Sequence, residues 1–138
     1  MPLRIENGLK SRIVTLLKEA RDAFKNEPDL GRALTKIPSI RSISRGLIDL
    51  AEDEDTRFAA VLVGQFLALL DYYEGKTEKW YETNRESVAA LMRATAGYLD
   101  NLARAFDSKD DQGVVNATRT WFFRYHEITR GTTADVGE

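Results

Sequence analysis

The sequence predicts an all-α protein, a helical bundle of four major helices with one or two short helices. Apolar residues recur at helical spacing through most of the chain, and no stretch alternates apolar and polar residues over more than a few positions, as a strand would. The chain has 138 residues, of which 43% are hydrophobic and 30% charged, enough for one core but not for a second full domain. We therefore expect a single domain over residues 1–131 and a frayed tail over 132–138.

The N-terminal third predicts one long helix and two shorter helical segments. Over 8–26 the apolar residues fall three or four positions apart and mark one face of a helix. Asp29 is placed to cap a short helical turn that Pro38 interrupts. Ser39 is then expected to cap the next helix, which closes at the acidic run 52–55. Within this third the helix boundaries rest on proline and capping residues.

The middle of the chain, Phe58 to Tyr73, predicts a helix that is apolar around its whole circumference. Only Gln65 and Asp71 are clearly polar, and 16 residues are too few to span a bilayer. Gly64 lies in a row of small residues that would let a neighbouring helix approach closely. Because so small a chain offers little cover, we expect a homodimer or larger assembly that hides part of this helix or of the last one. The residues expected in the core or the oligomer contact are Phe58, Leu62, Phe66, Leu69 and Tyr73.

The second half predicts two long helices. Gly75 ends the apolar segment, and Thr77 starts a helix that runs toward Phe106 with a heptad-like apolar seam. A last helix follows and stops at Gly131. Four aromatic residues flank Gly75, so a turn there would gather them at one end of the bundle, as a cap on the core or as a protein or ligand pocket. These four are Tyr72, Tyr73, Trp80 and Tyr81.

Composition excludes several classes of site. With no cysteine, the chain can form no disulfide, thiolate metal site, iron–sulfur cluster or cysteine nucleophile. A single histidine cannot build a histidine-rich metal cage, and no glycine-rich phosphate loop is present. The sequence therefore predicts no metal and no cofactor, and it favours a non-enzymatic role without deciding the question.

Charge is distributed unevenly along the chain. Residues 1–45 carry ten Lys or Arg and five Asp or Glu, whereas residues 46–138 carry ten and seventeen. This asymmetry suggests a polyanion at the basic end, a second copy packed head to tail, or a solvated surface. The N-terminus lacks the uninterrupted apolar region of a signal peptide, and the absence of cysteine suits a reducing compartment. We expect a cytoplasmic protein with no membrane contact.

The last helix carries a candidate site. Arg119, Phe123, His126 and Arg130 step by four, three and four positions, so they share one face and could bind an anion or RNA. The alternative is that this face is only solvated. The arginine and the histidine are separated by six residues, and the segment 119–126 thereby resembles the arginine-to-histidine motif of the HEPN ribonucleases. That resemblance implies a small helical protein that cleaves RNA at a dimer interface.

The sequence favours a non-enzymatic helical-bundle protein that acts through self-association and protein–protein interaction, as an adaptor or a subunit. The hypothesis rests on the apolar central helix and on the missing catalytic motifs. The alternative is an RNA-binding helical subunit of a ribonucleoprotein. A more specific form of that alternative is an HEPN-like ribonuclease that uses Arg119 and His126.

Overall fold

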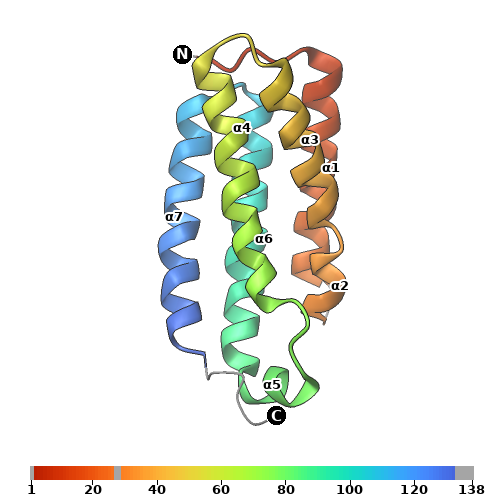
Figure 1. Ribbon diagram of the computed structural model, residues 1–138, viewed down its shortest axis with the longest axis vertical. Helices are drawn as coiled ribbons and strands as arrows, with labels where there is room; N and C mark the ends of the chain where they lie inside the picture. Colours follow the sequence, from red (N-terminus) through yellow and green to blue (C-terminus); the bar gives the residue numbers. More distant parts are fainter. Residues whose placement is uncertain (1, 27–28, 133–138) are drawn as a thin grey trace.

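The computed structural model describes residues 2–26 and 29–132, and in this part of the chain the prediction of an all-α helical bundle is confirmed (Figure 1). Two short helices join or cap the longer ones, and a 3-10 segment directly follows one long helix. The long helices are α1 (Asn7–Asn26), α3 (Ile37–Leu50), α4 (Glu54–Leu67), α6 (Arg85–Asp107) and α7 (Asp111–Arg130); the short ones are α2 (Leu30–Leu34) and α5 (Glu78–Thr83), and the 3-10 segment is η1 (Ala68–Tyr73).

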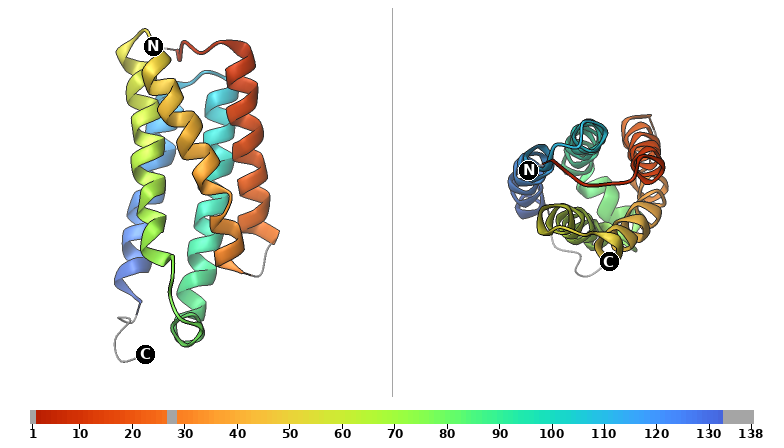
Figure 2. Two further views of the ribbon diagram at one scale, coloured as in Figure 1. Left: turned by 45° about the vertical axis from the view of Figure 1, so that its right-hand side comes forward. Right: turned by 90° about the horizontal axis from the view of Figure 1, so that it is seen from above.

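The five long helices form a closed ring around one core. α6 packs between α1 and α7, α4 packs between α7 and α3, and a smaller contact between α3 and α1 completes the ring. The view from above in Figure 2 shows this ring. α1, α4 and α7 run in one direction, and α3 and α6 run in the other. The core lies inside the ring, and α4 and α7 are parallel neighbours.

The predicted apolar stripes of the two long C-terminal helices point into the core. In α6 the heptad-like seam is buried from Met92 to Phe106. In α7 the buried side chains recur every three or four residues, as the spacing predicted. The buried seam residues are Met92, Thr95, Leu99, Leu102 and Phe106 in α6, and Val114, Thr118, Trp121, Tyr125 and Ile128 in α7.

Helix starts follow capping chemistry, with one correction. Asp29 and Thr77 cap α2 and α5 as predicted, each accepting a backbone N–H with its side chain. The prediction that Ser39 caps the next helix is wrong, because α3 begins at Ile37 and Pro38 lies in its first turn. Proline is tolerated there because first-turn amides have no partner within the helix. The segment is therefore 14 residues long and becomes a fifth long helix.

Two predicted continuous helices are broken in the structure. The helix expected to run from Thr77 toward Phe106 is interrupted at Asn84, which is buried and donates its side-chain N–H to the carbonyl of Trp80 at 2.9 Å. The helix expected over 58–73 is α-helical only to Leu67 and then narrows into η1. The narrower winding changes the direction of the last side chains, so that Tyr73 enters the core.

Residues before α1 form a strap that periodicity could not predict. Leu3 and Ile5 are buried, and the Leu3 N–H donates to the carbonyl of Lys109 at 2.8 Å. The Arg4 N–H donates to Thr56 Oγ1 at 2.8 Å. The strap therefore crosses the end of the bundle from the α6–α7 turn to α4 and closes that end of the core (Figure 2).

Candidate interaction face

Exposed apolar side chains gather on the outer side of α4 and α7. Phe58 of α4 is 54% exposed and Phe123 of α7 is 64% exposed, although both are large aromatic residues. Four further apolar residues between them are only half-buried. We call the set the apolar face: Phe58, Leu62, Phe66, Leu69, Phe122 and Phe123.

The aromatic rings of the apolar face are in contact across the two helices. Phe66 of α4 meets Phe122 of α7 edge to face, with ring centroids 5.2 Å apart. Phe122 in turn lies 6.1 Å from Phe123 and 6.3 Å from the ring of His126. Phe66, Phe122 and Phe123 therefore form one connected group of rings across the two helices.

The face exists because α4 places its smaller residues inward. Its core side carries Ala59, Ala60 and Val63, which are almost completely buried, while Phe58 points outward. Small residues on that side also bring α3 close, and a methyl group added at Gly64 would lie 4.0 Å from Cβ of Ser44. The largest apolar side chains of this helix are consequently left where the chain itself does not cover them.

The register of α4 against α7 is fixed by three contacts. The hydroxyl of Tyr125 donates to the carbonyl of Leu69 at 2.6 Å, and the hydroxyls of Tyr73 and Thr129 lie 2.8 Å apart. Phe66 and Phe122 form the ring pair described above. All three pairs are separated by 56 positions, so α7 lies against the end of α4 and against η1 with this offset over residues 66–73.

The structure places the predicted site residues of α7 together. Arg119, Phe123, His126 and Arg130 are all exposed and share the outer side of the helix, as their spacing predicted. None of the three basic residues forms an ion pair with another described residue. Whether this stripe binds anions or RNA stays a prediction.

Of the residues expected in the core or the oligomer contact, Tyr73 is separate from the other four. Phe58, Leu62, Phe66 and Leu69 belong to the apolar face, whereas Tyr73 is fully buried because η1 turns it inward. Phe122 is the member of the face that the sequence analysis missed. Its signal was available, since Phe122 lies four positions after Thr118, next to the buried stripe of α7.

Charged residues of both signs surround the apolar face. At the start of α4, Glu54 and Asp55 are exposed together with Arg57. At the end of α7, Arg130 is exposed together with Glu127. The face is therefore rimmed by mixed charge.

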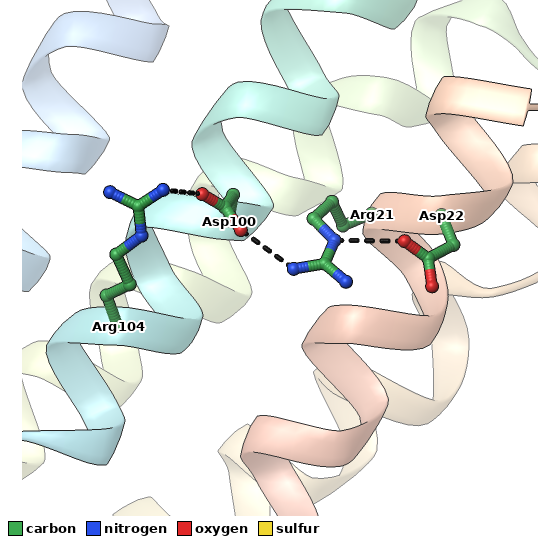
Figure 3. Close-up of polar contacts among 4 residues, drawn as sticks. All are labelled: Arg21, Asp22, Asp100 and Arg104. Carbon is green, nitrogen blue, oxygen red and sulfur yellow. Dashed lines mark hydrogen bonds and ion pairs between the residues drawn. The ribbon is translucent and has the colours of Figure 1, made fainter.

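Part of the charge asymmetry along the chain is taken up by ion pairs within the chain. Lys10 pairs with Asp107 at 3.6 Å, and Arg41 pairs with Asp71 at 3.3 Å. In Figure 3, Arg21 of α1 reaches across to Asp100 of α6, with 2.8 Å between guanidinium and carboxylate. These pairs join the basic first third to the acidic remainder and leave fewer cations for a polyanion.

Asp100 accepts from two arginines, one on each side (Figure 3). The hydrogen bond from Arg21 holds the pKa of the Asp100 carboxyl below its usual value, and Arg104 adds to the effect. The Arg21 side chain also contacts Asp22 at 3.0 Å. These contacts join α1 to α6, and each oxygen of the Asp100 carboxylate accepts a hydrogen bond from an arginine.

The aromatic residues that flank Gly75 come together as predicted. Gly75 adopts a φ of +72°, the left-handed conformation that glycine tolerates, and η1 and α5 fold back on each other there. The hydroxyl of Tyr81 donates to the carbonyl of Tyr73 at 2.6 Å. We call the interlocked rings the end cluster: Tyr73, Trp80, Tyr81 and Tyr125, with neighbouring centroids between 5.4 and 6.2 Å apart.

The end cluster closes the core. Trp80 and Tyr73 are almost completely buried, and burial raises the pKa of Tyr73 to about 12 although the hydroxyl is hydrogen-bonded to Thr129. Lys76 covers the outer edge, with its ammonium 4.3 Å from the ring centre of Tyr72. The contacts are those of an end cap, one of the two roles that the sequence left open.

The remaining hollows are shallow and open to solvent. One of about 430 Å³ lies between α2, α5 and α6 and is lined by acidic, basic and apolar residues in turn. Within residues 2–26 and 29–132, no three His, Asp or Glu side chains are grouped so that they could hold a metal ion. No helix in the same ranges is long and apolar enough to cross a membrane.

No protein-family model, curated protein or solved structure matches this chain. The functional argument therefore rests on the geometry of the apolar face.

Proposed function

We propose that this protein is a non-enzymatic interaction protein, an adaptor or subunit that associates with itself and with protein partners through the apolar face. The observation that supports the proposal is the exposure of Phe58 on α4 and of Phe123 on α7, together with the ring contacts that join Phe123 through Phe122 to Phe66. Exposed apolar patches rimmed by polar residues are typical of protein-interaction sites. Aromatic side chains are enriched at such sites because each buries a large area with few rotatable bonds.

Covering the face with a partner is energetically favourable because it removes apolar surface from water. A buried aromatic side chain removes roughly 150–250 Å² from water, so covering two rings that are 54% and 64% exposed removes on the order of 100 Å² each. The half-buried Leu62, Phe66, Leu69 and Phe122 add to this area. The exposed rings and the charged residues around them resemble the anchor-and-rim arrangement of protein interfaces.

The test is a double substitution with a matched control. Phe58→Ser with Phe123→Ser is expected to weaken self-association by about 10- to 100-fold, as loss of central aromatic anchors does. Leu50→Ser is the control, because Leu50 is 69% exposed but lies at the end of α3, outside the face. Sedimentation velocity over a concentration series measures the association. Equal association of the double variant and the wild type would exclude the face as the interaction site.

RNA binding is the second candidate, and one observation favours it. Arg119, His126 and Arg130 are exposed without an ion pair to any described residue, beside the exposed ring of Phe123. Cations next to an aromatic ring suit a nucleic-acid strand, with the charges on phosphates and the ring under a base. RNA binding predicts a gel shift that weakens steeply with salt and is lost in Arg119→Ala with Arg130→Ala. The ribonuclease version predicts cleavage that is lost in His126→Ala.

A further inference from the structure

We propose that the protein partner on the apolar face is an acidic amphipathic helix, which places apolar side chains against the rings and carboxylates along the edge of α7. This inference rests on the proposed function and adds the chemistry of the partner. It follows from the charges that accompany the rings where Phe66 meets Phe122. In this stretch α7 carries basic side chains without ion pairs, whereas α4 and η1 are mainly apolar and aromatic.

The outer edge of α7 carries three basic residues, which we call the basic row: Arg119, His126 and Arg130. All three are exposed, and none of them forms an ion pair with another described residue. The glutamate of the same stretch, Glu127, pairs instead with Arg124 at 3.3 Å. Residues 119–130 hold three arginines and one glutamate, so positive charge beside the rings is left for a partner to neutralise.

The neighbouring part of α4 and η1 does not neutralise the basic row. Residues 66–73, which lie against α7, contain one acid, Asp71. Its carboxylate pairs with Arg41 of α3 at 3.3 Å. The next acid along the chain, Glu74, lies beyond η1 and forms no ion pair with a described residue of the row. Carboxylates of a partner are therefore favoured at this end of the face by charge complementarity.

The acids at the other end of the face are distant from the basic row. Glu54 and Asp55 lie at least eleven positions before Phe66, which is about 16 Å along the helix. This separation exceeds the Debye length at physiological ionic strength, about 8 Å, so these exposed acids contribute little at the row. The mixed charge of the whole rim therefore resolves into a basic stretch beside Phe122 and Phe123.

The spacing of the basic row fits a helical partner. Its members are seven and four positions apart, which is two turns and one turn of α7, or about 10 Å and 6 Å. A helix that lies alongside α7 repeats at the same intervals, so carboxylates seven and four positions apart on its edge can each face one member of the row. Its apolar edge then covers Phe122 and Phe123, as amphipathic helices do in hydrophobic grooves.

The apolar residues of the face favour a protein over RNA. Bases bind by stacking on exposed aromatic rings, and of the face only Phe58 and Phe123 are largely exposed. The remaining area belongs to half-buried leucines and phenylalanines: Leu62, Phe66, Leu69 and Phe122. Leucine side chains are stabilised by contact with apolar side chains, which a helix supplies along one edge and an RNA strand does not carry.

Selection from a peptide library tests the chemistry of the partner. The probe is a library of helices of about 15 residues displayed on phage, with leucine fixed along one edge and Glu, Gln or Lys allowed at the other positions. The wild-type protein is expected to retain sequences that prefer glutamate to lysine beside the leucines by about tenfold or more. Retention without this preference, or no retention, would overturn the inference.

Charge reversal tests whether the basic row causes the preference. Arg119→Glu with Arg130→Glu is expected to retain lysine in place of glutamate, because the edge of α7 becomes acidic. Arg12→Glu with Arg93→Glu is the matched control, since both arginines are exposed but lie on α1 and α6, outside the face. The control is expected to keep the preference for glutamate. An unchanged preference in the first variant, or a reversal in both, contradicts binding at the basic row.

The remaining outcomes separate this inference from the proposed function. Neutral peptides that bind the wild type and are lost in Phe58→Ser with Phe123→Ser would overturn the acidic partner and leave the apolar face as an interaction site. A single-stranded RNA of about 20 nucleotides that binds more tightly than the selected peptides, and loses binding in Arg119→Glu with Arg130→Glu, would assign the row to RNA instead. Self-association is measured separately by sedimentation and does not depend on either result.

Discussion

Two groups of aromatic residues in the molecule, the end cluster and the apolar face, have opposite surroundings. The end cluster is built from Tyr and Trp, is buried, and interlocks across η1, α5 and α7. The apolar face is built from Phe and Leu and is left partly or largely exposed on α4 and α7. The comparison shows that a buried tyrosine of this chain has a partner for its hydroxyl, whereas the phenylalanines left exposed on α4 and α7 have no polar atom that needs one.

Hydrogen bonds explain the covered group. The hydroxyls of Tyr73, Tyr81 and Tyr125 each have a partner within the chain. A buried tyrosine without a partner would be costly, so these bonds make burial of the end cluster possible. Phenylalanine imposes no such requirement, and its ring is suited to a surface that another molecule covers.

The largest expected effect separates the two groups by stability. Trp80→Ala is expected to lower the free energy of unfolding by about 3–5 kcal/mol, because it removes a buried indole and leaves a cavity. Phe123→Ala, on the exposed face, is expected to change it by no more than about 0.5 kcal/mol. Urea denaturation of both variants, at a concentration where the wild type is monomeric, measures the difference. Similar losses would mean that the face also stabilises the monomer.

High pH is expected to act on buried tyrosines and not on the apolar face. Burial raises the pKa of Tyr73 from its ordinary value near 10 to about 12, and burial also raises that of Tyr98. The folded state then holds its protons more tightly, so this stability is present below pH 10 and is lost as pH rises toward 12. For Tyr73 the loss is about 2–3 kcal/mol.

Urea midpoints at pH 8, 10 and 11 are expected to fall in the wild type and to fall less in Tyr73→Phe. An equal fall in Tyr73→Phe would contradict the assignment to Tyr73.

The smallest effect concerns one hydroxyl group. Tyr73→Phe keeps the buried ring but removes the hydrogen bond to Thr129, and is expected to cost about 1 kcal/mol at pH 7. Tyr72→Phe is the matched control, since Tyr72 is the neighbouring tyrosine and is 41% exposed. Thermal unfolding of the two variants measures the difference. If both were neutral, ring packing alone would hold the end cluster.

Periodicity and capping residues made much of the fold predictable. The buried stripes of α1, α6 and α7 follow from apolar spacing, and Asp29 and Thr77 begin helices as their side chains require. The failures fall at Ser39 and at the two breaks. Pro38 predicts the end of a helix, but proline is equally compatible with the first turn of one, and the structure places it in the first turn of α3. Nothing in the local sequence marks Asn84 as a helix break. The break is stabilised in the fold, where the buried Asn84 side chain donates a hydrogen bond to the carbonyl of Trp80.

The candidate site was also predictable only in part. The stripe of Arg119, Phe123, His126 and Arg130 was predictable, since four residues on one helix face need only the helical repeat. The contact of that stripe with Phe66, through Phe122, was not predictable, because it depends on α4 lying parallel to α7 at one register. Residue spacing also could not predict which charges pair within the chain, since Arg21 pairs with Asp100 of a helix distant in the sequence.

The sequence by itself determined that this protein is helical, which faces of α1, α6 and α7 are buried, and that a segment in mid-chain carries almost only apolar side chains. These follow from local periodicity and from the size of the chain. Only the tertiary structure decided which side of that segment stays exposed and which residues of α7 extend it. The physical reason is that helix neighbours and register are set by packing across the whole core, where small residues of α4 turn inward and leave Phe58 outside.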